Sequence, residues 1–169
     1  MKAKPKIHLI ALLLLFAAVT GCIKKEEYPI EPEISFGSYG VLPDVNGNDS
    51  IGVLTISYTD GDGDIGLYSY DSVEPYKYNY FLKFLEWRNG AFQEVQLADT
   101  SFTFNSRIPI LTPEGKNKNI RGDISMFLEM YYAYMALKSD TVAFEVYIQD
   151  RALHKSNVLQ TPTFVVNRP

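Results

Sequence analysis

The sequence predicts an all-β domain, an antiparallel sandwich of about seven to eight strands. Two observations predict this class. Several short segments alternate apolar and polar residues with a period of two and are rich in β-branched and aromatic residues. Gly, Asp, Asn and Pro separate these segments, and no helical segments alternate with them as a parallel sheet requires. We therefore expect two packed antiparallel sheets.

The expected strands are short segments along the whole body of the chain. In order they span residues 33–38, 52–59, 76–87, 91–97, 101–105, 124–132, 141–150 and 163–167. The tetrapeptide "RNGA" at 88–91 is a strong hairpin signal, because Asn-Gly adopts the left-handed conformations of a tight turn. The segment 124–138 is ambiguous, since its methionines and Leu137 favour a helix and its aromatic residues favour a strand. We predict a strand for its first half and leave the second half open.

The alternation within two segments shows which residues form the core. In 52–59 one face carries Leu54, Ile56 and Tyr58. In 141–150 the inward face carries Val142, Phe144, Val146 and Ile148. The order of segments is compatible with an immunoglobulin-like fold, with 33–38 as strand A, 52–59 as B, 76–87 as C, 124–132 as E, 141–150 as F and 161–167 as G. Trp87 then lies on strand C, where such folds often bury a tryptophan; burial in any β-core accounts for it equally well.

The first 21 residues have the parts of a secretory signal peptide. Lys2, Lys4 and Lys6 form a basic start, and the apolar run 9–19 follows. This run is too short to cross a bilayer, which takes roughly 20 residues. The run ends in Val19-Thr20-Gly21-Cys22, which resembles the lipobox of bacterial lipoproteins. The resemblance implies that Cys22 is lipidated and becomes the mature N-terminus; the alternative is an ordinary signal peptide with an incidental cysteine.

The chain therefore divides into three parts. We expect a lipoprotein signal peptide over 1–21, a lipid-anchored tether over 22–31 and an immunoglobulin-like sandwich over 32–169. Acyl chains on Cys22 would attach the domain to the outer membrane of the cell. The stretch "IKKEE" at 23–27 resembles the surface-export signal of Bacteroidota lipoproteins; the alternative is that these charged residues are only a solvated tether. Surface exposure is slightly favoured over a periplasm-facing location.

Charge and cysteine content exclude some classes of partner. The chain has 16 basic and 20 acidic residues, and removal of 1–21 takes away three lysines, which leaves 13 minus 20, or −7. An acidic domain is a poor candidate for nucleic acid or for a basic lipid-binding patch, so we expect no nucleic acid partner. Cys22 is also the only cysteine. Without a disulfide, the exported domain must depend on its core or on a metal.

The stretch "YTDGDGDIGL" at 58–67 contains the candidate metal site. Asp60, Asp62 and Asp64 stand at every second position with glycines between them, and all-oxygen carboxylate clusters suit calcium. An EF-hand loop is excluded, because Ile65 stands where that loop requires glycine and because strands flank the stretch. Two interpretations remain open: a calcium loop between strands, and an exposed hairpin whose Asp-Gly turns hold no ion.

Topology adds a fourth candidate ligand. In an immunoglobulin-like sandwich the B–C and F–G loops lie at the same end. The aspartate loop follows strand B, and Asp150 ends strand F with Asn157 shortly after it. We expect Asp150, with Asn157 as a further candidate, to complete a metal shell begun by Asp60, Asp62 and Asp64. Strand A begins at this end too, so a bound calcium ion would stiffen the domain near its tether.

The sequence contains few candidate catalytic residues, and we expect no enzymatic activity. His154 is the only histidine after residue 21, and it follows Asp150 by four residues, a spacing more typical of an exposed histidine beside an acid than of a catalytic pair. A small hydrolase that uses clustered carboxylates remains an open alternative, because carboxylate separation is a spatial property.

Five tyrosines crowd residues 68–80. If these tyrosines are exposed, they would form a stacking platform for sugar rings. If they are buried in alternation along a strand, they would belong to the core and to the face of a sheet.

Two blocks resemble a known family. "YTDGDGDIGL" (58–67) and "VYIQDRALHKSNVLQTPTF" (146–164) resemble a family of Bacteroidota lipoproteins and cover a minority of the chain. The resemblance implies an immunoglobulin-like domain and an exported address, and it implies no particular activity. The sequence thus favours a membrane-anchored binding or structural module with an envelope protein or glycan partner; the alternative is a glycan-binding accessory of an outer-membrane nutrient-uptake system.

Overall fold

A computed structural model describes residues 26–97, 99, 102–111 and 119–168, so the predicted signal peptide and Cys22 lie outside the described residues. The strands and the helix follow one another along the chain with the bounds β1 Glu33–Pro43, β2 Asp49–Asp60, β3 Tyr80–Arg88, β4 Ala91–Glu94, β5 Ile120–Glu129, α2 Tyr131–Ala136, β6 Thr141–Ile148, β7 Leu159–Gln160 and β8 Phe164–Val165. The predicted all-β class is confirmed.

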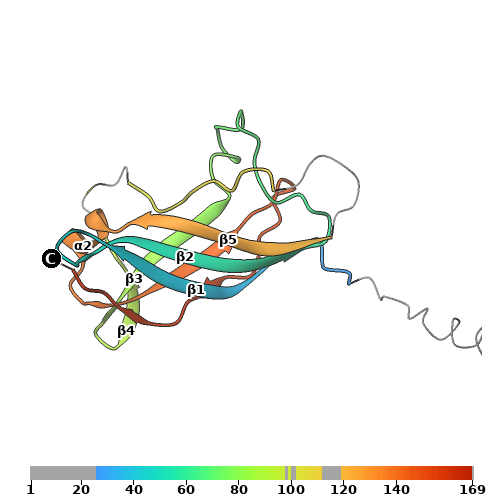
Figure 1. Ribbon diagram of the computed structural model, residues 1–169. Coiled ribbons are helices and arrows are strands. Elements are labelled where there is room, and N and C mark those ends of the chain that lie inside the picture. The colour runs from blue at the N-terminus through green and yellow to red at the C-terminus, as the bar shows by residue number, and fades with distance from the viewer. Residues whose placement is uncertain (1–25, 98, 100–101, 112–118, 169) are drawn as a thin grey trace, which may run out of the picture.

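Two antiparallel sheets pack face to face (Figure 1). One sheet has the order β1-β2-β5, and the other has the order β4-β3-β6-β7 with β8 also paired to β6. This is the arrangement of strands A, B and E against C, F and G in an immunoglobulin-like sandwich. The consequence for the candidate site is that the connections after β2 and after β6 leave the sandwich at the same end.

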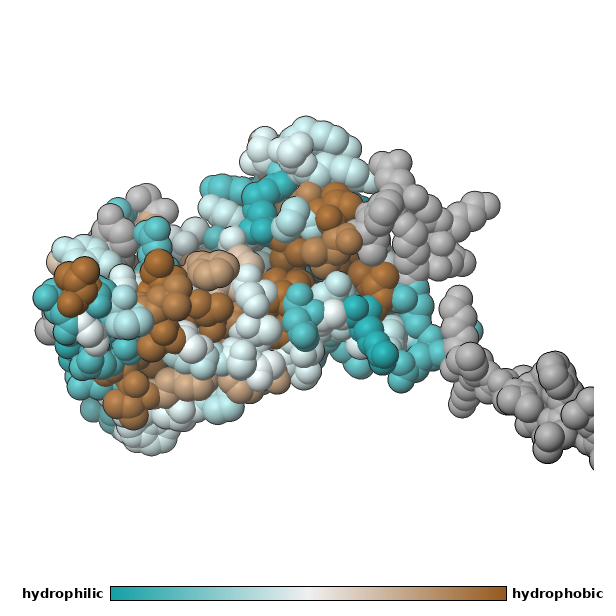
Figure 2. All heavy atoms as spheres, in the orientation of Figure 1, coloured by the Kyte–Doolittle hydropathy of each residue, from teal (hydrophilic) through white to brown (hydrophobic). Residues whose placement is uncertain are grey.

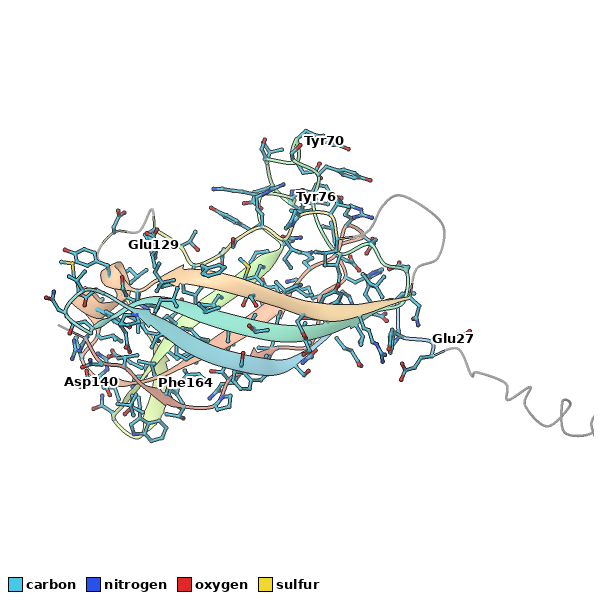
Figure 3. All side chains as sticks on the ribbon, in the orientation of Figure 1. Glu27, Tyr70, Tyr76, Glu129, Asp140 and Phe164 are labelled. Carbon is cyan, nitrogen blue, oxygen red and sulfur yellow. The ribbon has the colours of Figure 1, made fainter. Side chains whose placement is uncertain are left out.

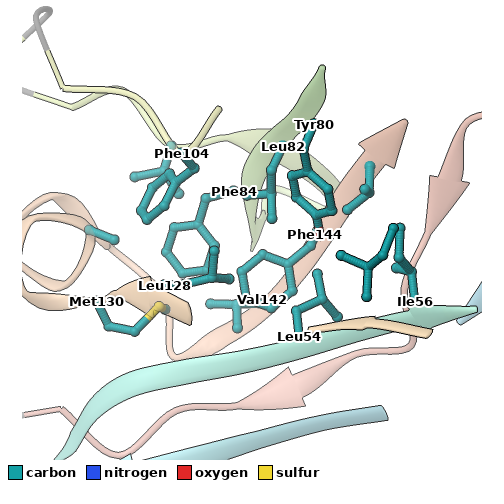
Figure 4. Packing of buried hydrophobic residues seen from close by; sticks show 14 of the residues in the cluster. Leu54, Ile56, Tyr80, Leu82, Phe84, Phe104, Leu128, Met130, Val142 and Phe144 are labelled. Carbon is teal, nitrogen blue, oxygen red and sulfur yellow. The ribbon is translucent and has the colours of Figure 1, made fainter. Parts of the chain in front are cut away.

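The core lies between the sheets and is built from the alternation that the sequence shows (Figure 4). On β2, Leu54 and Ile56 are fully buried, as expected. On β6 the four residues predicted to face inward are all fully buried: Val142, Phe144, Val146 and Ile148. Phe144 occupies the centre, with ring centroids 5.3 Å from Phe84 and 5.1 Å from Tyr39. Each such buried side chain contributes about 1.5–3 kcal/mol through the area it removes from water.

The hairpin between β3 and β4 forms where Asn-Gly predicts it. Asn89 and Gly90 both have positive φ, 55° and 83°, which is the signature of a type I′ turn. The register then places Trp87 opposite Phe92 on the outer face, where Trp87 is 45% exposed. A buried tryptophan on strand C was the wrong expectation, because the inward position next to it belongs to Glu86. Glu86 is buried, accepts hydrogen bonds from the Lys138 and Ser139 amides and lies 3.5 Å from Arg88.

Two expected strands differ from the structure, and the structure decides the half of 124–138 that the sequence left open. The described part of 101–105 forms no strand; instead Ser106 makes an isolated bridge with Tyr80, and β3 begins at Tyr80, not at residue 76. The undecided half of 124–138 is helical: β5 ends at Glu129, and α2 follows at once. The helix forms because Met130 is fully buried and its carbonyl accepts the Tyr134 amide at 2.9 Å. Among the described residues no helix has the length and apolar character needed to span a bilayer.

We expect Phe144→Ala to lower the free energy of unfolding by about 3–5 kcal/mol, since it removes a fully buried ring and leaves a cavity. Phe127→Ala is the matched control, because Phe127 on β5 is 67% exposed and its loss should change stability by about 0.5 kcal/mol or less. Urea unfolding of both variants measures the difference. Equal effects of the two substitutions would contradict the assignment of the core.

Candidate metal site

The aspartate loop begins with a carboxylate that is buried by the strand pattern itself. Asp60 is the last residue of β2 and continues the inward-facing series of Leu54 and Ile56, and it is fully buried. A buried carboxylate needs hydrogen-bond donors. The loop supplies them: the backbone amides of Asp62, Asp64 and Ile65 donate to Asp60 at 3.3, 3.0 and 3.2 Å. The chain after β2 therefore folds around the Asp60 side chain.

The other residues of the motif hold this loop in place. Ile65, the residue that excludes an EF-hand, is fully buried and anchors the loop in the core. A Cβ atom at Gly61 would lie 2.3 Å from the Tyr28 carbonyl oxygen. Gly66 has a φ of 110°, and a Cβ there would lie 2.3 Å from the Pro109 carbonyl oxygen. Glycine is required at both positions, because neighbouring backbone passes too close for a side chain.

Asp60, Asp62 and Asp64 converge. Each offers one carboxylate oxygen, and these atoms all lie within 4.8 Å of one another. Asp62 Oδ1 and Asp64 Oδ1 are shielded from solvent and have no hydrogen-bond partner among the described residues. An unsatisfied buried acceptor costs roughly 1–3 kcal/mol, and more when it is charged. A cation among the three carboxylates would remove that cost.

The electrostatics of the loop agree with this geometry. Burial raises the pKa of Asp60 to about 6, and the hydrogen-bonded, negatively charged Asp62 side chain adds to the effect. Burial also raises the pKa of Asp64 to about 6, with further contributions from the charges of Asp150 and Asp62, while Arg151 opposes them. Without a cation, the folded protein therefore disfavours the ionised forms of both groups relative to water.

The turn after β6 lies against this loop, as the sandwich topology predicts. The Ala152 amide donates to Asp64 Oδ2 at 3.2 Å, and Arg151 Nη1 donates to the Gly66 carbonyl at 3.0 Å. Asp150 is buried and close enough for its charge to act on Asp64. It lies outside the group of three converging carboxylates, because its own oxygens are used elsewhere.

His154 uses the Asp150 carboxylate. Asp150 Oδ1 accepts the His154 amide at 2.8 Å, and Oδ2 lies 2.9 Å from the His154 ring Nδ1. This hydrogen bond raises the pKa of His154, which is half-exposed. Asn157 does not lie at the aspartate cluster: its side chain accepts from the Ile34 amide at 2.8 Å and donates to the Ile34 carbonyl at 2.9 Å, which ties the turn to β1.

The segment that precedes β1 docks beside the aspartate loop. The Gly61 amide donates to the Pro29 carbonyl at 2.7 Å, and the Tyr28 amide donates to Asn119 Oδ1 at 2.7 Å. Arg121 at the start of β5 forms an ion pair with Glu26 at 3.0 Å. The end of the predicted tether is thus attached both to the aspartate loop and to β5. Sequence reasoning missed Asn119 and Arg121 because nothing local in the sequence pairs them with residues 26–29.

The crowded tyrosines do not form one surface. Tyr80 is fully buried, whereas Tyr70 is 74% exposed at the tip of the loop 61–79 (Figure 3). Tyr70 stacks on Tyr68 with centroids 5.1 Å apart, and Tyr76 lies lower in the same loop and is half-buried. Figure 2 shows a pale and teal tip above hydrophobic residues at the base of this loop. The flat row of tyrosines that a sugar platform needs is absent over 68–80.

Comparisons with family models, with curated proteins and with solved structures gave no match to this chain. The local geometry therefore carries the functional argument, and its electrostatic part can be tested.

We expect the calcium-free protein to lose stability as the pH rises from about 4 to about 7. The Asp60 and Asp64 carboxyls have pKa values of about 6 when folded, and an unfolded Asp titrates near about 3.9. The folded state therefore binds these protons more tightly, so their stabilisation is fully present below about pH 4 and is lost as the pH rises through about 6. Urea unfolding in EDTA at a series of pH values measures this slope.

Two variants isolate the cause of the slope. Asp64→Asn removes one of the two titrations and keeps an oxygen for the Ala152 amide, so it should flatten the fall. Asp123→Asn removes an exposed carboxylate on β5 and should leave the fall unchanged. The interpretation is wrong if the wild type and Asp64→Asn have the same pH dependence.

Proposed function

We propose that this chain is a membrane-anchored lipoprotein of the cell envelope whose immunoglobulin-like domain is a non-enzymatic binding or structural module stabilised by calcium. The observation that carries the proposal is the pair of shielded, unpartnered oxygens on Asp62 and Asp64 beside the buried Asp60 carboxylate. Three carboxylates held this close by backbone amides and glycines form a preorganised anionic cluster.

Calcium suits the cluster better than other common cations. The converging donors are carboxylate oxygens only, which hard cations prefer, and no histidine belongs to the group. Calcium accepts six to eight oxygens in flexible geometry, whereas magnesium demands near-ideal octahedral geometry and retains its waters. A loop between strands supplies uneven ligand positions, which favours calcium.

The proposed address depends on the amino-terminal sequence. The signal-peptide pattern, the lipobox ending at Cys22 and the resemblance to Bacteroidota lipoproteins together support export and lipid anchoring at the outer membrane. The position of the aspartate loop supports a role for calcium near the anchor, because Gly61 bonds the backbone of the segment that leads back to Cys22. Calcium binding would therefore stiffen the domain where the segment that leads to Cys22 joins it.

The geometry of the carboxylates favours a stabilising role over a catalytic one. General acid–base chemistry needs carboxyl oxygens within reach of a substrate proton. Here Asp60 is fully buried, and one oxygen each of Asp62 and Asp64 is shielded from solvent. The Asp150–His154 pair is engaged in closing its own turn, with two hydrogen bonds between the same two residues. These contacts support a stabilising role for the cluster.

We expect about 10 mM calcium to raise the melting temperature of the purified protein by roughly 5–10 °C. Extracellular modules commonly bind calcium with a Kd of about 10⁻⁴–10⁻³ M, and calcium at 100 times the Kd adds about 2.7 kcal/mol to stability. Thermal unfolding followed by circular dichroism, with calcium or with EDTA, measures the shift.

Two loop variants test where the ion acts. Asp62→Asn should abolish the calcium-dependent shift, because Asp62 belongs to the converging group. Asp71→Asn lies in the same loop but outside that group, where the Asp71 side chain accepts the Tyr68 amide, so its shift should match the wild type. A melting temperature that calcium leaves unchanged, or a shift that survives Asp62→Asn, would refute the calcium site.

We expect Cys22→Ser to move the protein from the membrane fraction to the soluble fraction of a Gram-negative host and to abolish incorporation of labelled palmitate. The physical reason is that acyl chains supply the membrane affinity, about 0.8 kcal/mol for each buried CH₂ group, and a net charge of −7 after residue 21 supplies none. Fractionation and palmitate labelling measure both effects. Palmitate incorporation in Cys22→Ser equal to that of the wild type would contradict lipidation at Cys22.

A further inference from the structure

A groove lies on the outer face of the second sheet, between β3, β4, β6 and the segment 103–105. Its cavity has a volume of about 230 Å³. Two cross-strand pairs of β3 and β6 line it: Phe81 opposite Tyr147, and Lys83 opposite Glu145. The residues between them on both strands are buried in the core, so the groove has a floor of paired strands. That floor is rigid and needs no ordering when a ligand binds.

Phe81 lines the groove, and its ring stacks on Tyr147, with centroids 4.6 Å apart and planes 8° from parallel. Tyr147 is held in turn by Lys155, whose amino group lies 5.4 Å from the ring centroid. On the far edge of β3, Asn105 Oδ1 accepts the Leu82 amide at 3.1 Å, which fixes the segment 103–105 opposite Phe81. The groove is therefore a slot with an aromatic wall and a polar wall.

Polar side chains also line this slot. The Lys83 amino group and Glu145 Oε1 form an ion pair at 2.6 Å, and both side chains are partly exposed to the groove. Glu94 is exposed on the β4 side, where its charge acts on Lys83, and it makes no ion pair among the described residues. Asn105 adds an amide group. The slot thus offers both hydrogen-bond donors and acceptors near the Phe81 ring.

The charge of the groove selects among ligands. Two carboxylates, Glu94 and Glu145, stand against one ammonium group, Lys83. This excess of negative charge disfavours anionic ligands, and so does the acidic balance of the whole chain. The volume is below the 300–1,000 Å³ typical of drug-sized ligands, as a site for a single small ring would be.

We propose that this groove binds one uncharged pyranose ring of a glycan, with the C–H face of the sugar on Phe81 and its hydroxyl groups on Glu94, Asn105 and the Lys83–Glu145 pair. The negative π-face of an aromatic ring attracts the weakly positive C–H groups of a pyranose, and carboxylate, amide and ammonium groups pair with its hydroxyls. This proposal names a ligand class for the binding role proposed above and rests on that role. Its location differs from the tyrosine platform that the sequence suggests, because Phe81 and Tyr147 meet only across the sheet.

The test uses the purified protein on an array of immobilised neutral and uronic-acid oligosaccharides, with follow-up titration calorimetry on the best ligand. We expect retention of neutral glycans and none of the uronic-acid set. Phe81→Leu keeps an apolar side chain but loses the ring face, and it should weaken binding about tenfold. Glu94→Gln changes an exposed carboxylate that the fold does not need, and it should weaken binding of the same ligand.

Trp87→Leu is the matched control. Trp87 is an exposed aromatic residue on the same face of β3, paired edge-to-face with Phe92 outside the groove, and its loss should change affinity less than about twofold. The groove assignment is overturned if no neutral glycan is retained, if uronic acids bind as well as neutral sugars, or if Trp87→Leu weakens binding as much as Phe81→Leu. The calcium shift in melting temperature, measured on the same sample, shows whether such a failure concerns the groove alone or the proposed module.

Discussion

The burial of the Asp60 carboxylate at the end of β2 constrains the end of the domain where the segment before β1 docks. Its position continues the inward face of the strand, so the charge is removed from water before the loop begins. The amides of Asp62, Asp64 and Ile65 turn back to satisfy it, and this turn brings the next two carboxylates beside the first. The carboxylate cluster is thus a consequence of satisfying one buried side chain with the nearest available backbone amides.

The same loop connects three parts of the chain that are distant in sequence. Asp64 accepts the Ala152 amide of the turn after β6, and Gly61 donates to Pro29 in the segment before β1. Asn157 ties that turn to the first residues of β1. Carboxylate repulsion within the loop therefore affects the contacts that join the body of the domain to its amino-terminal segment. Neutralising those charges would strengthen the contacts that hold the segment before β1 to the domain.

The aspartate cluster and the groove lie in different parts of the domain and depend on different contacts. The aspartate cluster lies at the end of the sandwich near the amino-terminal segment, while the groove lies on the outer face of the second sheet. The groove depends on the cross-strand register of β3 and β6, and none of Asp60, Asp62 and Asp64 lines it. Stability and recognition can then vary independently during the evolution of such a domain.

The sequence by itself determined most of the strands, the antiparallel sandwich class and the Asn-Gly hairpin, because period-two alternation and turn chemistry are local properties. It also identified Asp60, Asp62 and Asp64, whose spacing is local too. Tertiary structure decided the rest. Whether Trp87 or Glu86 faces the core depends on which side of β3 the partner sheet packs, and the use of Asp150 by His154 depends on how one turn closes. The Phe81–Tyr147 wall exists only through a register between strands about sixty residues apart, which no local pattern specifies.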